Sequence, residues 1–131
     1  MRTTALLLSL TLGVFTCPAQ YLADNASSSQ PEDLFQAGEK AYRSGDHATA
    51  ITLYTQVLEV DPEHINAYLQ RGFCHTLLKE YEPAIADFSA AIARKPDHLW
   101  AYTSRGSAYN KLGRHDEAMA DFDRVIAIDP K

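Results

Sequence analysis

The sequence has few of the residues on which most enzyme and metal sites depend. It contains two cysteines and one tryptophan in 131 residues, and it has neither a glycine-rich phosphate loop nor a serine-nucleophile motif. The formal net charge is -5, and acidic and basic residues are interspersed, so the chain has no basic stripe of the kind that binds nucleic acid. We therefore predict no catalytic residues, no cofactor and no nucleic-acid partner.

A long hydrophobic run is also missing. The mostly apolar stretch from Ala5 to Phe15 would reach roughly 16 Å as a helix, against about 30 Å of membrane hydrocarbon. Arg2 precedes this stretch and a small residue, Ala19, follows it, a pattern typical of a secretory signal peptide over residues 1–19. We expect export to the periplasm, the cell envelope or the medium, and no integral membrane span.

Cys17 allows a second interpretation of this segment. Residues 14–17 also resemble a lipoprotein signal in which Cys17 would carry a lipid anchor, but the two residues before it are larger than that signal requires. Cleavage after Ala19 would leave Cys74 as the only cysteine, so no intramolecular disulfide could form in an exported product. We expect Cys74 to be a small core residue.

The segment that follows the predicted signal peptide is polar. Residues 20–30 carry three consecutive serines and lack helical periodicity. They are therefore predicted to form a disordered linker.

A 34-residue repeat is the most specific feature of the chain. Prolines, glycines and alanines recur at this spacing, at Pro62, Pro96 and Pro130, at Gly38, Gly72 and Gly106, and at Ala50, Ala84 and Ala118. They divide the chain into units of residues 31–64, 65–98 and 99–131. Apolar and small residues recur every three or four positions, which predicts two amphipathic helices in each unit. The prolines predict that the second helices end near Val60, Arg94 and Ile128.

The turn between the two helices differs in the middle unit. Two units have a glycine there, Gly45 and Gly113, whereas the middle unit has Lys79. A side chain at a position that favours glycine predicts local strain at Lys79.

The repeated residues resemble the tetratricopeptide repeat. They are Tyr68, Arg71, Gly72, Ala84, Phe88, Ala91 and Pro96, with their counterparts one period later, and the resemblance covers residues 31–131. It implies an all-α fold, an α-solenoid of three antiparallel helix-turn-helix repeats in a right-handed superhelix. The first helix of each repeat would line a concave groove. Together with the predicted export and groove, it indicates a non-enzymatic adaptor or scaffold that binds a protein or peptide, with a self-associating structural subunit and an enzyme subunit as the alternatives.

The resemblance implies which side chains face the groove. They are Phe35, Gln36, Glu39 and Tyr42, then Asn66, Leu69, Gln70 and Phe73, then Trp100, Thr103, Ser104, Ser107 and Lys111. Buried aromatic side chains often dominate binding energy, so Trp100, Phe73, Leu69 and Phe35 are the predicted affinity anchors. Packing into the core is the alternative role for these four residues.

One ligand class of the family fits this chain poorly. Relatives that bind chaperone tails hold a terminal carboxylate with a clamp of lysine, asparagine and arginine. The corresponding residues here are Phe35, Glu39, Gln70, Trp100 and Ser104. Glu39 would repel a carboxylate, so we expect an extended or helical apolar segment instead.

Two pairs of charged residues change together between the units. The first unit has Ala37 and Leu53 at two positions where the others have an arginine and an aspartate. The charged residues are Arg71 with Asp87, and Arg105 with Asp121. We predict two partly buried ion pairs, with a grip on an acidic ligand as the alternative role of the arginines.

The five histidines do not form a metal-binding pattern. Four follow the repeat, since His64 and His98 lie one period apart and His47 and His115 lie two periods apart, all in predicted turns. His75 follows Cys74 directly, and adjacent helical residues point about 100° apart. We therefore predict no metal site.

The last helix has no polar capping helix after it. Phe122, Val125 and Ile126 would then be partly uncovered. Three explanations remain open: contact with a partner, pairing with a second copy in a homo-oligomer, or truncation of a longer repeat array.

Overall fold

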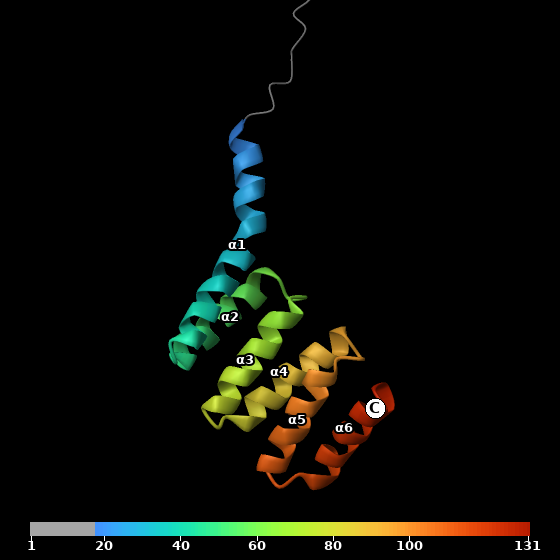
Figure 1. Cartoon of the computed structure of the whole chain (residues 1–131). Helices are drawn as coiled ribbons and strands as arrows, with labels where there is room; N and C mark the ends of the chain where they lie inside the picture. The colour runs from blue at the N-terminus through green and yellow to red at the C-terminus, as the bar shows by residue number, and fades with distance from the viewer. Residues whose placement is uncertain (1–17) are drawn as a thin grey trace, which may run out of the picture.

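The computed structural model describes residues 18–131, and most of the predicted signal peptide, including Cys17, lies outside them. The described residues form six helices: α1 (Pro18–Arg43), α2 (His47–Val60), α3 (Ile65–Leu77), α4 (Tyr81–Arg94), α5 (Leu99–Lys111) and α6 (His115–Ile128). The helices pair as α1 with α2, α3 with α4 and α5 with α6. Figure 1 shows these antiparallel pairs stacked side by side, with the start of α1 extending beyond the stack. The predicted all-α solenoid of three helix-turn-helix repeats is confirmed. Within residues 18–131 no helix is both long and apolar enough to cross a membrane.

Residues 20–30 differ from the sequence prediction because they lie in α1 rather than in a linker. This stretch contains neither glycine nor proline. Once a helix has formed, each further residue adds one hydrogen bond, so a polar segment can extend a helix that is packed elsewhere. Pro31 lies inside α1, where it lacks the N–H that would donate to the carbonyl one turn earlier. Polarity alone was therefore a poor indicator of disorder here.

The second helix of each repeat ends where the prolines predict, at Val60, Arg94 and Ile128. At each end the next residue still donates its N–H to the carbonyl four residues earlier, as Asp61 does to Val57 at 2.7 Å. The proline that follows cannot continue this pattern because it has no N–H. The sequence prediction of these three helix ends is confirmed.

Histidine side chains cap two of the first helices. The Nδ1 atom of His64 accepts a hydrogen bond from the N–H of Ala67 at 3.0 Å, and His98 accepts one from Ala101 at 3.4 Å. Each bond satisfies a donor that the helix itself leaves free. The 34-residue spacing of these histidines thus has a structural cause. No cluster of histidine, cysteine and carboxylate side chains within the described residues could hold a metal ion.

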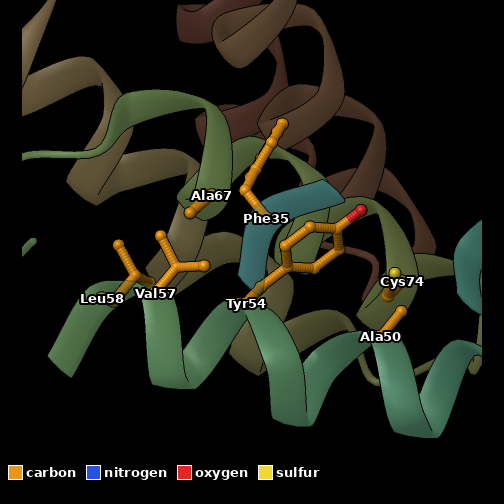
Figure 2. Packing of buried hydrophobic residues seen from close by; sticks show 7 residues of the cluster. All are labelled: Phe35, Ala50, Tyr54, Val57, Leu58, Ala67 and Cys74. Carbon is orange, nitrogen blue, oxygen red and sulfur yellow. The ribbon is translucent and has the colours of Figure 1, made fainter. Parts of the chain in front are cut away.

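The core is built from short contacts between each first helix and its partner. Figure 2 shows part of it, where Phe35 from α1, Tyr54 and Val57 from α2, and Ala67 from α3 meet. Each repeat sets a glycine against an aromatic ring, and a Cβ atom at Gly72 would lie only 2.8 Å from the Phe88 ring. This close approach of the two helices depends on glycine, because the aromatic ring fills the space that a side chain would need.

Lys79 has the strain that the sequence predicts. Its φ angle is +62°, close to the values of +83° and +73° at Gly45 and Gly113. An L-residue in this conformation costs roughly 1–2 kcal/mol, because its Cβ lies too close to the following carbonyl oxygen.

Replacing Lys79 by glycine is expected to raise the free energy of unfolding by about 1 kcal/mol, because it removes this strain. Urea denaturation followed by circular dichroism measures the change. The matched control is Gly113→Lys, which places a lysine at the equivalent turn of the third repeat and should lower stability by a similar amount. Unchanged midpoints for both variants would contradict the strain at this position.

Candidate functional site

Both predicted ion pairs are present in the structure, each within one repeat. Arg71 donates to Asp87 through Nε at 2.9 Å and through Nη2 at 2.6 Å. Arg105 donates to Asp121 with the same two distances. Both aspartates are buried. Each pair is therefore bidentate, with two N–H donors of one guanidinium bonded to the two oxygens of one carboxylate, which is the strongest form of arginine–carboxylate pairing.

The arginines also reach the preceding repeat, which the sequence reasoning missed. Arg71 Nη1 donates to the Thr55 hydroxyl on α2 at 3.0 Å, and Arg105 Nη1 donates to the Ser89 hydroxyl on α4 at 2.9 Å. Thr55 and Ser89 lie 34 residues apart. The recurrence of a hydroxyl at the repeat spacing could therefore have predicted these contacts. With these contacts, each guanidinium joins three helices and has little capacity left for an acidic ligand.

The ion pairs contribute to stability over the whole neutral range of pH. The hydrogen bond with its aspartate raises the pKa of Arg71 and of Arg105, against the opposing effect of burial. A group with a raised pKa stabilises the fold below its unfolded pKa, and this stability is lost only as pH rises through the folded pKa. For arginine that range is strongly alkaline, so arginine titration leaves the pairs intact near pH 7.

A small pocket lies on the first-helix side, between α3 and α5. Its volume is about 260 Å³, and it is lined by Phe73, Thr76, Trp100, Thr103, Ser104 and Ser107. All of these except Thr76 were predicted groove residues. Trp100 is 70% exposed, so its indole is available to a ligand rather than used in the core. Thr76 could have been found because it lies three residues after Phe73, on the same helix face.

The hydroxyl groups of the pocket differ in their partners. Thr76 donates to the carbonyl of Gly72 at 2.9 Å, and Thr103 donates to that of Leu99 at 3.0 Å. The donors of these two hydroxyls are therefore used within their own helices. Ser104 and Ser107 complete the pocket wall, with Ser107 exposed. The pocket combines two aromatic walls with short hydroxyl side chains.

Two of the four predicted anchors belong to the core, which corrects the sequence prediction. Phe35 is buried, with its ring centroid 5.5 Å from that of Tyr54 and 4.8 Å from that of His64. Leu69 is buried in the cluster around Phe88. Each lies on the face of its helix that packs against the partner helices, and helical spacing alone did not separate that face from the groove. Phe73 combines both roles, since its partly buried ring contacts Phe88 and lines the pocket.

The other predicted groove residues range from exposed to partly buried. Gln36, Asn66 and Lys111 are exposed, and Glu39, Tyr42 and Gln70 are partly buried. Tyr42 also packs against the core cluster that contains Tyr54. The binding role of all six residues stays a prediction.

Cys74 and His75 do not form a nucleophilic pair. Cys74 is fully buried, and burial raises the pKa of its thiol to about 11, so the thiol is protonated at neutral pH. His75 Nδ1 lies 2.6 Å from the carboxylate of Glu80. The prediction that Cys74 is a small core residue is confirmed.

Known proteins share this architecture. Two tetratricopeptide repeat models match residues 35–98 and 99–131. Small glutamine-rich tetratricopeptide repeat-containing protein 2 of Saccharomyces cerevisiae is 36% identical over 70 residues, which are 53% of this chain and 20% of that protein. The chain spans one fifth or less of the length of the four curated relatives compared with it.

Solved structures agree over most of the chain. The first TPR domain of Spaghetti (RPAP3), bound to the HSP90 peptide SRMEEVD, has a TM-score of 0.75 and 29% identity, covering 79% of this chain and 82% of that one. The Arabidopsis OM64 TPR domain has a TM-score of 0.75 and 25% identity, covering 80% of this chain and 87% of that one.

Proposed function

Because the chain belongs to the tetratricopeptide repeat family, we propose that it is a non-enzymatic interaction module whose concave face binds a segment of another protein. The pocket around Trp100 is the observation that carries this proposal. A largely exposed indole beside Phe73 offers apolar area that a ligand side chain can cover. Aromatic residues of this kind supply much of the binding energy at protein interfaces.

The pocket favours an apolar side chain carried on an extended or helical segment. Its volume of about 260 Å³ suits one large aliphatic or aromatic side chain rather than a whole small molecule. The hydroxyls of Ser104 and Ser107 are placed to bond the ligand's backbone or polar groups. An acidic peptide suits this face less well. The predicted groove residues include the anionic Glu39, which would repel acidic side chains, and only one cation, Lys111.

The HSP90 peptide bound to RPAP3 is an example of an acidic ligand. Its sequence, SRMEEVD, carries three acidic side chains. This chain has Glu39, Gln70 and Ser104 at places where the resemblance implies a cationic clamp. We therefore expect SRMEEVD to bind this chain far more weakly than an apolar segment does.

The only tryptophan in the sequence lies in the pocket and serves as a reporter. Peptides selected from a random displayed library on the whole chain should change the fluorescence of Trp100 in a saturable way. Fluorescence anisotropy of a labelled selected peptide should then show binding about 30-fold weaker for Trp100→Ala, the effect of losing roughly 2 kcal/mol at a central anchor.

Leu77→Ala is the matched control, because Leu77 is also exposed but does not line the pocket. It should bind the peptide as the wild type does. The thermal midpoint of Trp100→Ala should stay unchanged, since the indole is largely exposed. If Trp100→Ala retains full affinity, or melts the domain, the concave face is not the binding site.

We also propose that the module acts after export, in the periplasm, the cell envelope or the medium. The charged start, apolar stretch and small residues of positions 1–19 support this. Mass spectrometry of the exported protein should find Gln20 at the N-terminus. A cytoplasmic protein that retains residues 1–19 would contradict export.

A further inference from the structure

The outer face of α6 corresponds to faces that are covered elsewhere in the stack. We define this face by Met119, Phe122, Asp123 and Ile126. On the 34-residue spacing, Met119 corresponds to Ile85 and Ile126 corresponds, two periods earlier, to Leu58. Exposure is 8% at Ile85 and 9% at Leu58, but 63% at Met119 and 62% at Ile126. The difference arises because α3 packs on α2 and α5 packs on α4, whereas no described helix packs on α6 in this way.

The two covering helices share one pattern. Each presents a small residue, an arginine four positions later and another small residue three positions after that. These residues are Ala67, Arg71 and Cys74 in α3, and Ala101, Arg105 and Ala108 in α5, and the four small ones are buried. Small side chains let the helices approach closely, and the arginine reaches a hydroxyl on the covered helix, Thr55 or Ser89.

On α6 the hydroxyl is replaced by a carboxylate. Asp123 occupies the position of Thr55 and Ser89 on the repeat spacing, and it is exposed. A carboxylate accepts an arginine hydrogen bond more strongly than a hydroxyl does, because both groups are charged. From this match we propose that the outer face of α6 docks a helix of another protein with the pattern small residue, arginine, small residue. This proposal goes beyond the concave face and is independent of it.

A second copy of this chain fits the face poorly. The outward positions of α1 that correspond to Ala67, Arg71 and Cys74 are Asp33, Ala37 and Lys40. Head-to-tail stacking would therefore place the charged side chains of Asp33 and Lys40 against α6. The central position would hold Ala37 instead of an arginine. Two-fold pairing of α6 would bring Asp123 close to its own copy, because Asp123 lies midway between Met119 and Ile126, and like charges repel. A partner helix with a central arginine avoids both problems.

The probe for this surface is a labelled peptide with the sequence of residues 98–112, which carries the pattern. Fluorescence anisotropy with the whole chain should show saturable binding. Asp123→Lys should weaken it by about tenfold or more, as expected for a lost hydrogen bond between charged groups. A peptide in which glutamate replaces the arginine at the position of Arg105 should recover affinity for Asp123→Lys but not for the wild type.

The control is a variant, called the covered chain, in which an added helix packs on the outer face of α6. Lys131 corresponds to Asp97 on the repeat spacing, so a second copy of residues 98–112 joined directly after Lys131 continues the repeat in register. This added helix should cover the face and abolish binding of the labelled peptide, while Trp100→Ala should leave that binding unchanged. Circular dichroism checks that each variant is folded.

Three results would overturn the proposal. One is equal peptide affinity for the wild type, Asp123→Lys and the covered chain. Another is loss of peptide binding in Trp100→Ala, which would place the peptide on the concave face instead. The third is a dimer in light scattering that Met119→Glu dissociates, since a second copy would then occupy the face. The first and third results leave the proposed function of the concave face untouched, whereas the second would show that this face takes the peptide.

Discussion

Replacing Arg105 by alanine is expected to lower the free energy of unfolding by about 3 kcal/mol, because breaking a buried pair leaves an uncompensated charge. The buried carboxylate of Asp121 would lose hydrogen bonds of 2.9 and 2.6 Å from Nε and Nη2. The link from Nη1 to Ser89 would be lost as well. Urea denaturation followed by circular dichroism measures the loss.

The first repeat supplies the control for this prediction. It has Ala37 and Leu53 where the third repeat has Arg105 and Asp121, so Arg105→Ala with Asp121→Leu copies a natural combination. Removing both partners leaves no unpaired buried carboxylate, so the double variant should recover part of the stability, the remainder being lost because alanine does not fill the volume of the arginine. A double variant as unstable as the single one would show that the unpaired carboxylate is not what costs stability.

Phe88→Ala should cost about 3–5 kcal/mol of stability, the usual range for removing a buried aromatic ring. The ring is fully buried against Gly72, with the ring of Phe73 at a centroid distance of 5.4 Å. Because glycine supplies no side chain to fill the space, the cavity would be poorly repaired. Thermal and urea unfolding of the whole chain measure the effect.

Phe122→Ala is the matched variant, since Phe122 packs on Gly106 as Phe88 packs on Gly72. Phe122 is only partly buried, because no described helix covers the outer face of α6. We expect about half the loss seen for Phe88→Ala, in proportion to the smaller apolar area removed from water. Equal losses would indicate that coverage by a following helix adds little to core stability.

Repeat spacing explains why the fold was predictable from sequence. Prolines fixed the ends of the second helices through chemistry that is local to each residue. The start of α1 was not predictable in the same way, because its polar residues carry no apolar periodicity and extend a helix packed further along the chain. The caps of His64 and His98 were missed because serine, threonine, asparagine and aspartate are the usual N-cap residues.

The candidate site was only partly predictable. The ion pairs could be inferred because arginine and aspartate change together between repeats. Trp100 was correctly placed on the pocket rather than in the core, and it lies at the second position of α5, beside a turn. Phe35 and Leu69 were assigned to the groove because helical spacing gives a side chain's position around its helix only approximately, and burial depends on the neighbouring helices. Distances across three helices, such as that from Arg71 to Thr55, need the assembled structure.

The hydrogen bonds from Arg71 to Thr55 and from Arg105 to Ser89 also bear on how the solenoid unfolds. Stability in such an array is a sum of each repeat's own stability and its coupling to the nearest neighbours. Each of these bonds connects two neighbours, so the middle repeat is coupled on both sides and the outer repeats on one side only. Within the described residues, the first and third repeats are therefore expected to open before the middle one. The third, on whose outer side no described helix packs, is expected to separate most readily.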